Sequence, residues 1–301
     1  MPAPVIVTSG LGKTFRGKPA VSSVSLEVER GSVYAFLGPN GAGKTTTIRL
    51  LLGLMRPDAG TLALFDLPMP RRRAQILART GSLVESPSLY PHLTARENLE
   101  ITRRILDAPR TDIDRVLAVA GLHNAGGKLV RAFSLGMKQR LGLAQAMLGR
   151  RELLILDEPT NGLDPAGITE MRALIRRLPA EEGITVFLSS HLLGEVEQVA
   201  THVGILSQGS LIFQGTTAAV SALRQSRLRI RVGDIARAGA VLRARGWTVY
   251  TAEGALVAED CDAAGAMNRA LVEAGHDVHH LAIETASLED VFLGMTNAEV
   301  R

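Results

Sequence analysis

The sequence predicts an α/β fold: a sheet covered by helices on both faces, followed by a second and smaller α/β domain. Strand-length segments that are almost wholly apolar alternate with helical segments, which is typical of such a sheet. A glycine-rich loop at residues 38–43 joins one of these strands to a helix, and a helical stretch at residues 94–149 interrupts the alternation. With 301 residues, of which 46% are hydrophobic, the chain is long enough for a substantial core.

The chain before residue 60 is expected to form three strands, a loop and a helix. The second strand alternates apolar and polar residues, and the helix directly follows the glycine-rich loop. A turn comes after the helix. The expected strands cover residues 5–11, 21–29 and 31–38, the helix residues 44–55, and the turn residues 56–60.

The middle of the chain predicts a helical subdomain at about residues 86–149. Thr94 and Glu97 have the spacing of a capping box, in which each side chain bonds the backbone N–H of the other residue. A helix is therefore expected to begin there. Two segments without helical periodicity, residues 107–112 and 124–133, divide the subdomain into separate helices.

Strands and helices alternate again after the helical subdomain. The composition changes after Gly215, so a first domain is expected at residues 1–220 and a small accessory α/β domain at residues 221–301. The first domain is expected to end with a strand at residues 152–157, a helix at 165–178, a strand at 184–191, a helix at 192–200 and a hairpin at 202–215. The second domain is expected to begin with a strand at 227–232, to have helices at 235–245 and 262–274, and to end with a helix at 287–295.

Charge and composition exclude several classes of protein. The formal net charge is +4 and basic and acidic residues are interspersed, so composition gives no case for a nucleic-acid partner. No apolar run approaches the roughly twenty residues of a spanning helix, and residues 1–10 lack the basic head and long apolar segment of a secretory signal. The single cysteine, Cys261, allows no internal disulfide. We therefore expect a chain that works in the reducing cytoplasm and does not cross a membrane by itself.

The segment GPNGAGKTT fits the pattern G-x-x-x-x-G-K-[ST] of a phosphate-binding loop, and it lies between a predicted strand and a predicted helix. Glycines let backbone N–H groups converge on phosphates, and the helix N-terminus adds a partial positive charge. Lys44 is expected to reach the β- and γ-phosphates of a nucleotide, and the Thr45 hydroxyl to bind Mg²⁺. The predicted phosphate-binding residues are Gly38, Pro39, Asn40, Gly41, Ala42, Gly43, Lys44, Thr45 and Thr46.

Two carboxylates, Asp157 and Glu158, end the apolar segment LLILDEP. Asp157 suits the coordination shell of Mg²⁺. Glu158 suits a general base that polarises the attacking water. Paired acids at a strand end also occur as caps of the following helix, and the pair alone leaves that alternative open.

A phosphate-binding loop occurs in kinases, GTPases, motors and recombination ATPases, and the segment FSLGMKQRLGLAQAM at residues 133–147 distinguishes between them. Placed shortly before LLILDEP, it resembles the signature Leu-Ser-Gly-Gly-Gln of ATP-binding cassette (ABC) transporters. Ser134 and Gly136 match this signature, whereas Leu135 and Met137 depart from it. Ser134 is placed to cap a helix whose N-terminus faces an anion, and the resemblance implies that this anion is the γ-phosphate of ATP held by a partner subunit. Without its neighbours the segment is equally compatible with an ordinary amphipathic helix.

The resemblance implies a P-loop NTPase core of the ABC type with a helical signature subdomain, ATP and Mg²⁺ as cofactors, and ATP hydrolysis catalysed by Lys44, Glu158 and His191. Phe15 matches the aromatic residue that stacks on adenine, and His191, after TVFLSS, matches the histidine that contacts the γ-phosphate. Asp164, in NGLD, matches the loop that crosses the dimer interface. An isolated aromatic is also compatible with a core position, and a lone histidine with a packed or solvated one.

Glu85 departs from the family pattern, in which glutamine is usual at this position. The position lies in the loop that joins the sheet to the helical subdomain, senses the Mg²⁺ and γ-phosphate region, and contacts the membrane subunit. A carboxylate interacts with Mg²⁺ or its waters more strongly than an amide oxygen does, and the γ-phosphate repels it. Glu85 is therefore expected to join Thr45 and Asp157 as an Mg²⁺-binding residue. The resemblance therefore implies that Glu85 links the nucleotide to the membrane partner through residues 86–94. The alternative is a merely solvated acid.

The resemblance covers residues 5 to about 220 and includes one set of motifs. ATP in this family is bound between the loop of one subunit and the signature of another. This implies a second ATP-binding subunit, in a homodimer or with a paralogue, and a polytopic permease in a separate chain. We therefore expect the protein in the cytoplasm, peripheral on the inner face of the cell membrane through the permease.

Three segments narrow the resemblance: residues 81–99, residues 133–144 and the SLEDVFL sequence near the C-terminus. They are similar to ATPase subunits of antibiotic exporters, most of all the bacitracin and lantibiotic self-protection group. Exporters of drugs, lipids or polysaccharides share much of this pattern and remain alternatives. Two further alternatives are an ABC ATPase that acts on ribosomes or DNA, which usually carries two cassettes or a long coiled coil, and a binding module that has lost its ATPase activity.

Overall fold

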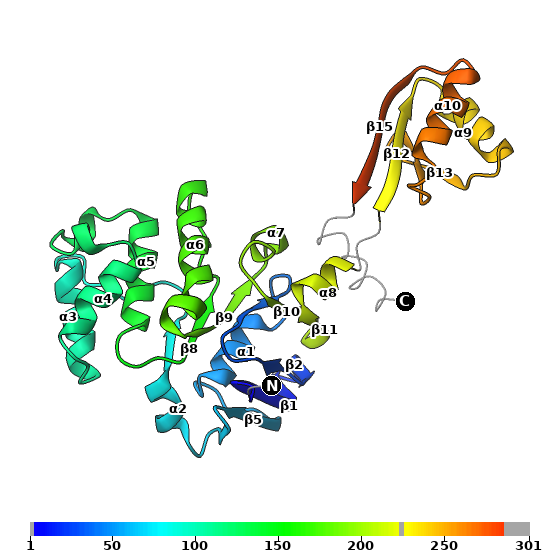
Figure 1. Cartoon of the computed structure of the whole chain (residues 1–301). Helices are drawn as coiled ribbons and strands as arrows, with labels where there is room; N and C mark the ends of the chain where they lie inside the picture. Colours follow the sequence, from blue (N-terminus) through cyan, green and yellow to red (C-terminus); the bar gives the residue numbers. More distant parts are fainter. Residues whose placement is uncertain (1–2, 223–225, 286–301) are drawn as a thin grey trace. The chain divides into compact units, whose positions relative to one another are not determined.

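The computed structural model describes residues 3–222 and 226–285, and the chain forms two compact units with a boundary between Ala218 and Ala219 (Figure 1). The boundary expected after residue 220 falls within helix α8 (Thr217–Ala222). The helix expected at residues 287–295 lies outside the described residues.

The central sheet of the first unit has six strands in the order β11-β10-β4-β9-β8-β7. All of them are parallel to their neighbours except β11, which forms the predicted hairpin with β10. Every residue of β4, β8 and β9 is buried, which explains why these segments are largely apolar rather than alternating. The strands are β4 (Val33–Leu37), β7 (Thr80–Leu83), β8 (Leu153–Asp157), β9 (Thr185–Ser190), β10 (His202–Ser207) and β11 (Ser210–Thr216).

The strand order of this sheet places three distant segments at one edge. Strands β4, β9 and β8 are neighbours, and their carboxyl ends point the same way. The glycine-rich loop follows β4, Asp157 ends β8, and His191 follows β9. Ligands of parallel α/β sheets bind at this edge, so the fold itself selects the location of the site.

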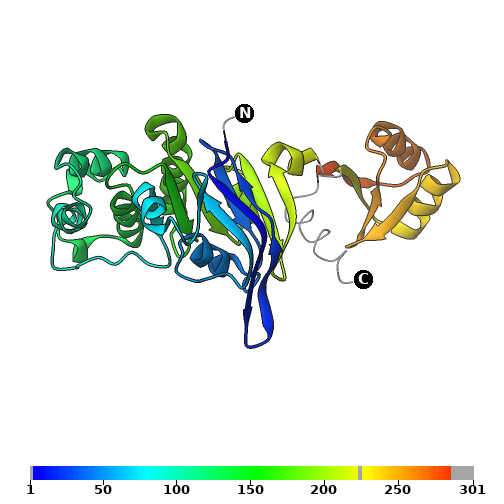
Figure 2. The ribbon, with the colours of Figure 1, turned by 90° about the horizontal axis from the view of Figure 1, so that it is seen from below.

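A second, antiparallel sheet shares a core with the central one. Ile6 and Leu64 of this sheet belong to one hydrophobic cluster with Phe36 and Phe187 of the central sheet, and Ile48 of helix α1 (Lys44–Leu51) joins them. Strands β1 and β2, blue in Figure 2, form a long hairpin. The strands are β1 (Ile6–Phe15), β2 (Lys18–Val24), β3 (Glu27–Val28), β5 (Ala59–Leu64) and β6 (Leu67–Pro68).

The predicted helical subdomain contains α3 (Ala95–Ile105), α4 (Thr111–Val119) and α5 (Leu135–Ala146), which Figure 1 shows grouped beside the central sheet. The predicted helix start at Thr94 is confirmed. Its hydroxyl accepts a hydrogen bond from the N–H of Glu97, and the Glu97 carboxylate accepts one from the N–H of Thr94.

Two helices differ from the expectation. Helix α2 (Arg73–Arg79) was not predicted, because its one buried residue, Ile76, produces no apolar periodicity. The helix expected at residues 192–200 is only one turn long, α7 (Leu193–Val196), and Gly194 within it weakens the helix. By contrast, α6 (Pro165–Glu182) begins at the predicted residue.

The second unit is a four-stranded antiparallel sheet in the order β13-β14-β12-β15. Two helices pack on it, and Leu228, Leu242 and Leu271 lie in the core that they share with the sheet. The elements are β12 (Ser226–Val232), α9 (Ile235–Ala244), β13 (Val249–Ala252), β14 (Ala255–Ala258), α10 (Ala264–Glu273) and β15 (Val278–Thr285), which confirms the strand and the two helices predicted from residue 227 to residue 274.

Candidate functional site

The glycine-rich loop tolerates no side chain at two of its positions. A Cβ on Gly38 would lie 2.6 Å from the carbonyl oxygen of Leu206, and one on Gly43 would lie 2.3 Å from that of Ala20. Gly43 also has a φ of +107°, which side chains disfavour. Among the described residues, no side chain caps helix α1, and its first turn carries no acidic residue. Its first N–H groups are therefore available to an anion such as a phosphate.

Lys44 lies inside this loop. Its side chain is 6% exposed, and its Nζ donates a hydrogen bond of 2.7 Å to the carbonyl oxygen of Gly38. The same Nζ lies 3.3 Å from Oε1 of Glu158. The cationic group is thus fixed between the loop and the carboxylate at the end of the neighbouring strands.

One buried hydroxyl orients both predicted carboxylates. Ser189, on β9, donates a hydrogen bond of 2.6 Å to Oδ1 of Asp157 and accepts one of 2.9 Å from the N–H of Glu158. Ser189 is not among the residues predicted for the site. The signal in the sequence was the pair of serines that follows the apolar residues Val186–Leu188 in TVFLSS, since buried hydroxyls in such a strand need partners.

The carboxylate of Glu158 contacts both Lys44 and His191. Its second oxygen, Oε2, lies 2.8 Å from Nδ1 of His191, so all three residues predicted to be catalytic lie together. Glu158 has a φ of 50°, a left-handed conformation that is uncommon for a residue with a side chain and that tends to occur at functional sites. The alternative that the acid pair caps the next helix is wrong, because Asp164 caps α6.

Replacing Ser189 with alanine is expected to disturb both carboxylates. The part-buried N–H of Glu158 then loses its acceptor and the buried carboxylate of Asp157 loses its donor, which costs about 1–3 kcal/mol of unfolding free energy. We expect a lower midpoint of denaturant unfolding and a reduced ATPase rate. Ser189→Thr, which keeps the hydroxyl, should restore most of the rate if the added methyl group is accommodated. A Ser189→Ala protein with unchanged ATPase rate and stability would contradict the orienting role.

The predicted signature and interface residues lie together where α5 and α6 begin. Ser134 caps α5 by accepting a hydrogen bond from the N–H of Met137, and Asp164 caps α6 by accepting one from that of Gly167. A Cβ on Gly136 would lie 3.7 Å from the Cα of Gly167, so the two helix starts are adjacent. Ser134 and Asp164 are exposed. The departures at Leu135 and Met137 leave the cap at Ser134 intact.

Phe15 is 43% exposed and lies at the end of β1, with Nζ of Lys13 at 5.7 Å from the centre of its ring. The hairpin that carries it reaches the glycine-rich loop through β2, because the carbonyl group of Ala20 lies against Gly43. An exposed ring at this position is available for stacking and does not belong to the core.

Glu85 forms an ion pair of 2.8 Å with Nη2 of Arg49, and its side chain is 66% exposed. Arg49 lies on α1 one helical turn after Thr45, so the two side chains lie on the same face of the helix. Like Glu158, Glu85 has a positive φ, here 63°. The structure thus places Glu85 beside the helix that begins at the glycine-rich loop, with Arg49 as its direct partner.

The donor set fits Mg²⁺ bound together with a nucleotide. Asp157, 5% exposed, supplies a carboxylate at the sheet edge, and Thr45 supplies a hydroxyl in the first turn of α1. Within the described residues no three or more histidine, cysteine or acidic side chains form a metal-binding cluster. Mg²⁺ needs no such cluster, because it takes one or two protein ligands and fills its shell with phosphate oxygens and water.

A groove of about 450 Å³ borders the predicted contact segment. Ser86, Pro87 and Ser88 line it together with apolar side chains that include Leu54 and Leu106, and these two are 58% and 39% exposed. Exposed leucines of this kind beside a polar rim favour a protein contact.

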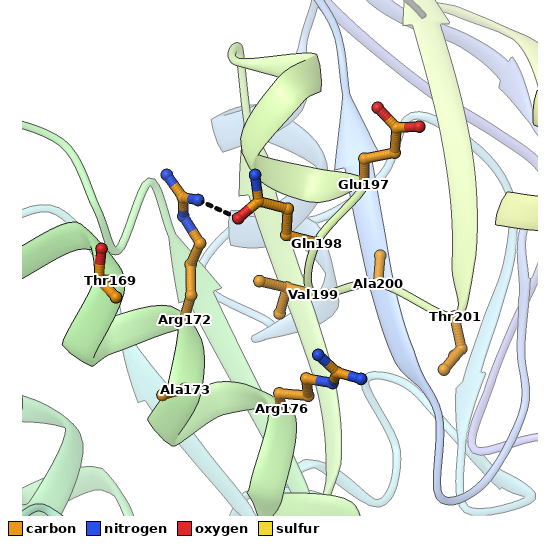
Figure 3. A pocket seen from close by; sticks show the side chains of 9 residues that line it. All are labelled: Thr169, Arg172, Ala173, Arg176, Glu197, Gln198, Val199, Ala200 and Thr201. Atoms are coloured by element: carbon orange, nitrogen blue, oxygen red, sulfur yellow. Dashed lines mark hydrogen bonds between the residues drawn. The ribbon is translucent and has the colours of Figure 1, made fainter. Parts of the chain in front are cut away.

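Figure 3 shows a larger cavity, of about 540 Å³, between α6 and the segment after α7. Arg172 points into it and donates a hydrogen bond to Oε1 of Gln198. None of the predicted site residues lines this cavity, so it is separate from the glycine-rich loop. Its lining residues are Thr169, Arg172, Ala173, Arg176, Glu197, Gln198, Val199, Ala200 and Thr201.

Comparison with known proteins identifies the family to which the chain is similar. The family model of the ABC transporter matches residues 21–161. The chain is 43% identical over 295 residues to the bacitracin transport ATP-binding protein BcrA of Bacillus licheniformis, covering 96% of both proteins. It is 40% identical over 204 residues to the lantibiotic transport ATP-binding protein SrtF of Streptococcus pyogenes, covering 68% of this chain and 87% of that protein.

The fold is also found among solved structures. The structure of cbiO1 from Clostridium perfringens, part of the ABC transporter complex cbiONQ, superposes with a TM-score of 0.68 at 26% identity, and the match covers 73% of this chain and 92% of that one. No helix among the described residues has the length and apolar character needed to cross a bilayer. The fold class and the family predicted from the sequence are confirmed: the chain belongs to the ABC transporter family.

Proposed function

We propose that the chain is the ATP-binding and ATP-hydrolysing subunit of an exporter that extrudes a hydrophobic or peptide antibiotic, in self-protection or resistance. The observation that carries the ATPase activity is the cluster of Lys44, Glu158 and His191 beside a glycine-rich loop without a side-chain cap. The similarity to BcrA over 96% of the chain supports the antibiotic as cargo.

Under this proposal each residue of the site has a task in hydrolysis. The N–H groups of the loop and Nζ of Lys44 hold the β- and γ-phosphates and neutralise their charge. Asp157 and Thr45 would hold Mg²⁺, which when bound would supply positive charge against the charge that develops on the phosphate oxygens. Glu158 accepts a proton from the attacking water, and His191 orients the carboxylate from 2.8 Å and reaches the γ-phosphate. Phe15 stacks on adenine.

A second subunit completes the site. Ser134, Gly136 and Asp164 lie on an exposed surface at the starts of α5 and α6, and Ser134 and Asp164 satisfy N–H groups there. A helix start of this kind binds the γ-phosphate held by another copy of the chain. The groove beside Ser86–Ser88 receives a polytopic permease, which places the protein in the cytoplasm at the inner face of the cell membrane.

The function is tested in the bacterium that carries the chain. Deletion should increase sensitivity to bacitracin or a lantibiotic, and wild-type protein should restore resistance whereas Glu158→Gln protein should not. Co-purification with a hydrophobic membrane protein rather than with ribosomes separates a transporter from the non-transport alternative. Unchanged sensitivity to both antibiotic classes in the deletion strain would contradict the cargo and favour a drug, lipid or polysaccharide exporter.

Glu85→Gln is expected to keep ATP binding within about twofold and to lower antibiotic resistance, because the substitution removes the charge that responds to Mg²⁺ and the γ-phosphate. Arg49→Gln is expected to change resistance without a loss of stability, since an ion pair this exposed contributes little to folding. The minimal inhibitory concentration is measured at equal expression. Arg96→Gln, which breaks the similarly exposed pair with Asp114, is the control and should leave resistance unchanged. If Glu85→Gln left resistance unchanged, its special role would be refuted.

A further inference from the structure

We propose that two copies of the chain pair through strand β15 of their C-terminal units, so that the two sheets join into one continuous sheet. This contact is distinct from the ATP-binding contact between subunits, involves none of the residues of that site, and does not depend on nucleotide. It assigns the C-terminal unit the role of a dimerisation module.

Among the strands that the structure describes, β15 is the long edge of its sheet. It has eight residues and pairs with β12 on one side, whereas β13 at the opposite edge has four residues. An edge strand presents N–H and C=O groups that can pair with another strand unless lysine, proline or a bulge prevents it. The bulge in β15 lies at His279, and residues 280–285 after it pair regularly with β12 and contain neither lysine nor proline.

Strand β15 carries an apolar side chain, that of Ile283, which the described residues leave largely exposed. Leu281 and Ile283 lie opposite Ile230 and Leu228, which are core residues, so both point to the face that the helices cover. Leu281 packs against the core, but Ile283 is 55% exposed. An isoleucine at a strand edge is stabilised by an apolar neighbour on an added strand.

The sequence of the strand is complementary to itself in one antiparallel register. A two-fold axis perpendicular to the sheet keeps the helices of both copies on one side, so each residue pairs with a residue of the same face. An axis at Ala282 places Ile283 opposite Leu281 of the second copy, and His280 opposite Glu284 of the second copy. Both pairs occur twice, and the small side chain of Ala282 lies at the axis.

The neighbouring registers lack this complementarity. An axis at Leu281 would place His279 opposite Ile283 and His280 opposite Ala282. Glu284 would then have no basic partner on the second copy, although it keeps its ion pair with Arg229 of its own unit. Cross-strand pairs of opposite charge and of apolar residues stabilise a sheet, and like charges directly opposite destabilise it. The register centred on Ala282 is therefore the one that the residues favour.

The first test measures dimerisation of the full chain by analytical ultracentrifugation without nucleotide and with EDTA. We expect a dimer that Ile283→Lys and His280→Glu each weaken about tenfold, because the first puts a charge opposite Leu281 and the second puts two carboxylates opposite each other at two places. Val272→Lys, at a residue of α10 that is 59% exposed, changes an apolar side chain of similar exposure away from the edge and should have no effect. A monomer under these conditions, or a dimer that neither edge variant weakens, would overturn the proposal.

The second test fixes the register without destabilising the unit. In a Cys261→Ser background, Ala282→Cys should form a disulfide-linked dimer on mild oxidation, because residues opposite each other in an antiparallel pair have the Cα separation that a disulfide requires. Arg231→Cys, on the interior strand β12 and the same face, is the control and should remain monomeric on a denaturing gel. Equal cross-linking of the two variants would refute the edge contact, whatever the outcome for the ATP-binding contact.

Discussion

Glu158→Gln is expected to lower the rate of ATP hydrolysis by about 10²- to 10⁴-fold, the contribution of a positioned general base, while ATP is still bound. The glutamine amide keeps a hydrogen bond to His191, but it cannot accept the proton of the attacking water. Lys44 loses its carboxylate partner and retains the carbonyl oxygen of Gly38, so its charge stays in the loop and becomes more available to phosphate. Phosphate release measures the rate, and equilibrium binding of a fluorescent ATP analogue measures affinity.

Glu170→Gln is the matched control for this substitution. Its carboxylate is 57% exposed and pairs with Arg140, outside the cluster of Lys44, Glu158 and His191, so the rate of hydrolysis should stay at the wild-type level. Near wild-type turnover in the Glu158→Gln protein would remove Glu158 from the role of base. Loss of ATP binding in that protein would instead assign the residue a structural role in holding Lys44.

The elements predicted correctly are those whose characteristic residues all lie within one short segment of the sequence. The glycine-rich loop, the buried strand before Asp157 and the capping box at Thr94 each depend on residues within a few positions of one another. Their backbone geometry requires those residue types locally: glycine where a Cβ would touch Leu206 or Ala20, and a hydroxyl where a helix begins.

The contacts that were missed join residues distant in sequence. Ser189 bridges Asp157 and Glu158 because β8 and β9 are neighbours, and His191 meets Glu158 over a separation of 33 residues for the same reason. Arg49 and Glu85 are 36 residues apart, and the sequence around either residue does not indicate the other as its partner. Such contacts follow from strand order, which single motifs do not specify.

The second prediction with a large effect is that one ATP site needs residues from two subunits. A Lys44→Ala protein lacks the cation of the loop, and a Ser134→Arg protein places a bulky cation on the surface where α5 begins, so each alone should hydrolyse ATP at no more than a few hundredths of the wild-type rate. Mixed in equal amounts they form mixed dimers, in which Lys44 of one subunit and Ser134 of the other are both intact at one of the two sites. If exchange is random and the sites are independent, roughly a quarter of wild-type activity should return, since half the dimers are mixed.

The control separates rescue from simple association. Lys44→Ala protein mixed with the Lys44→Ala, Ser134→Arg double variant forms dimers equally well, but no site in them has both residues intact, so activity should stay at the level of the single variants. Mass spectrometry of differently tagged subunits establishes that mixed dimers are present. Mixed dimers without recovered hydrolysis would mean that Ser134 and Lys44 do not act on the same nucleotide. In that case the caps at Ser134 and Asp164 would be ordinary helix starts, and one chain would contain everything that its ATP site requires.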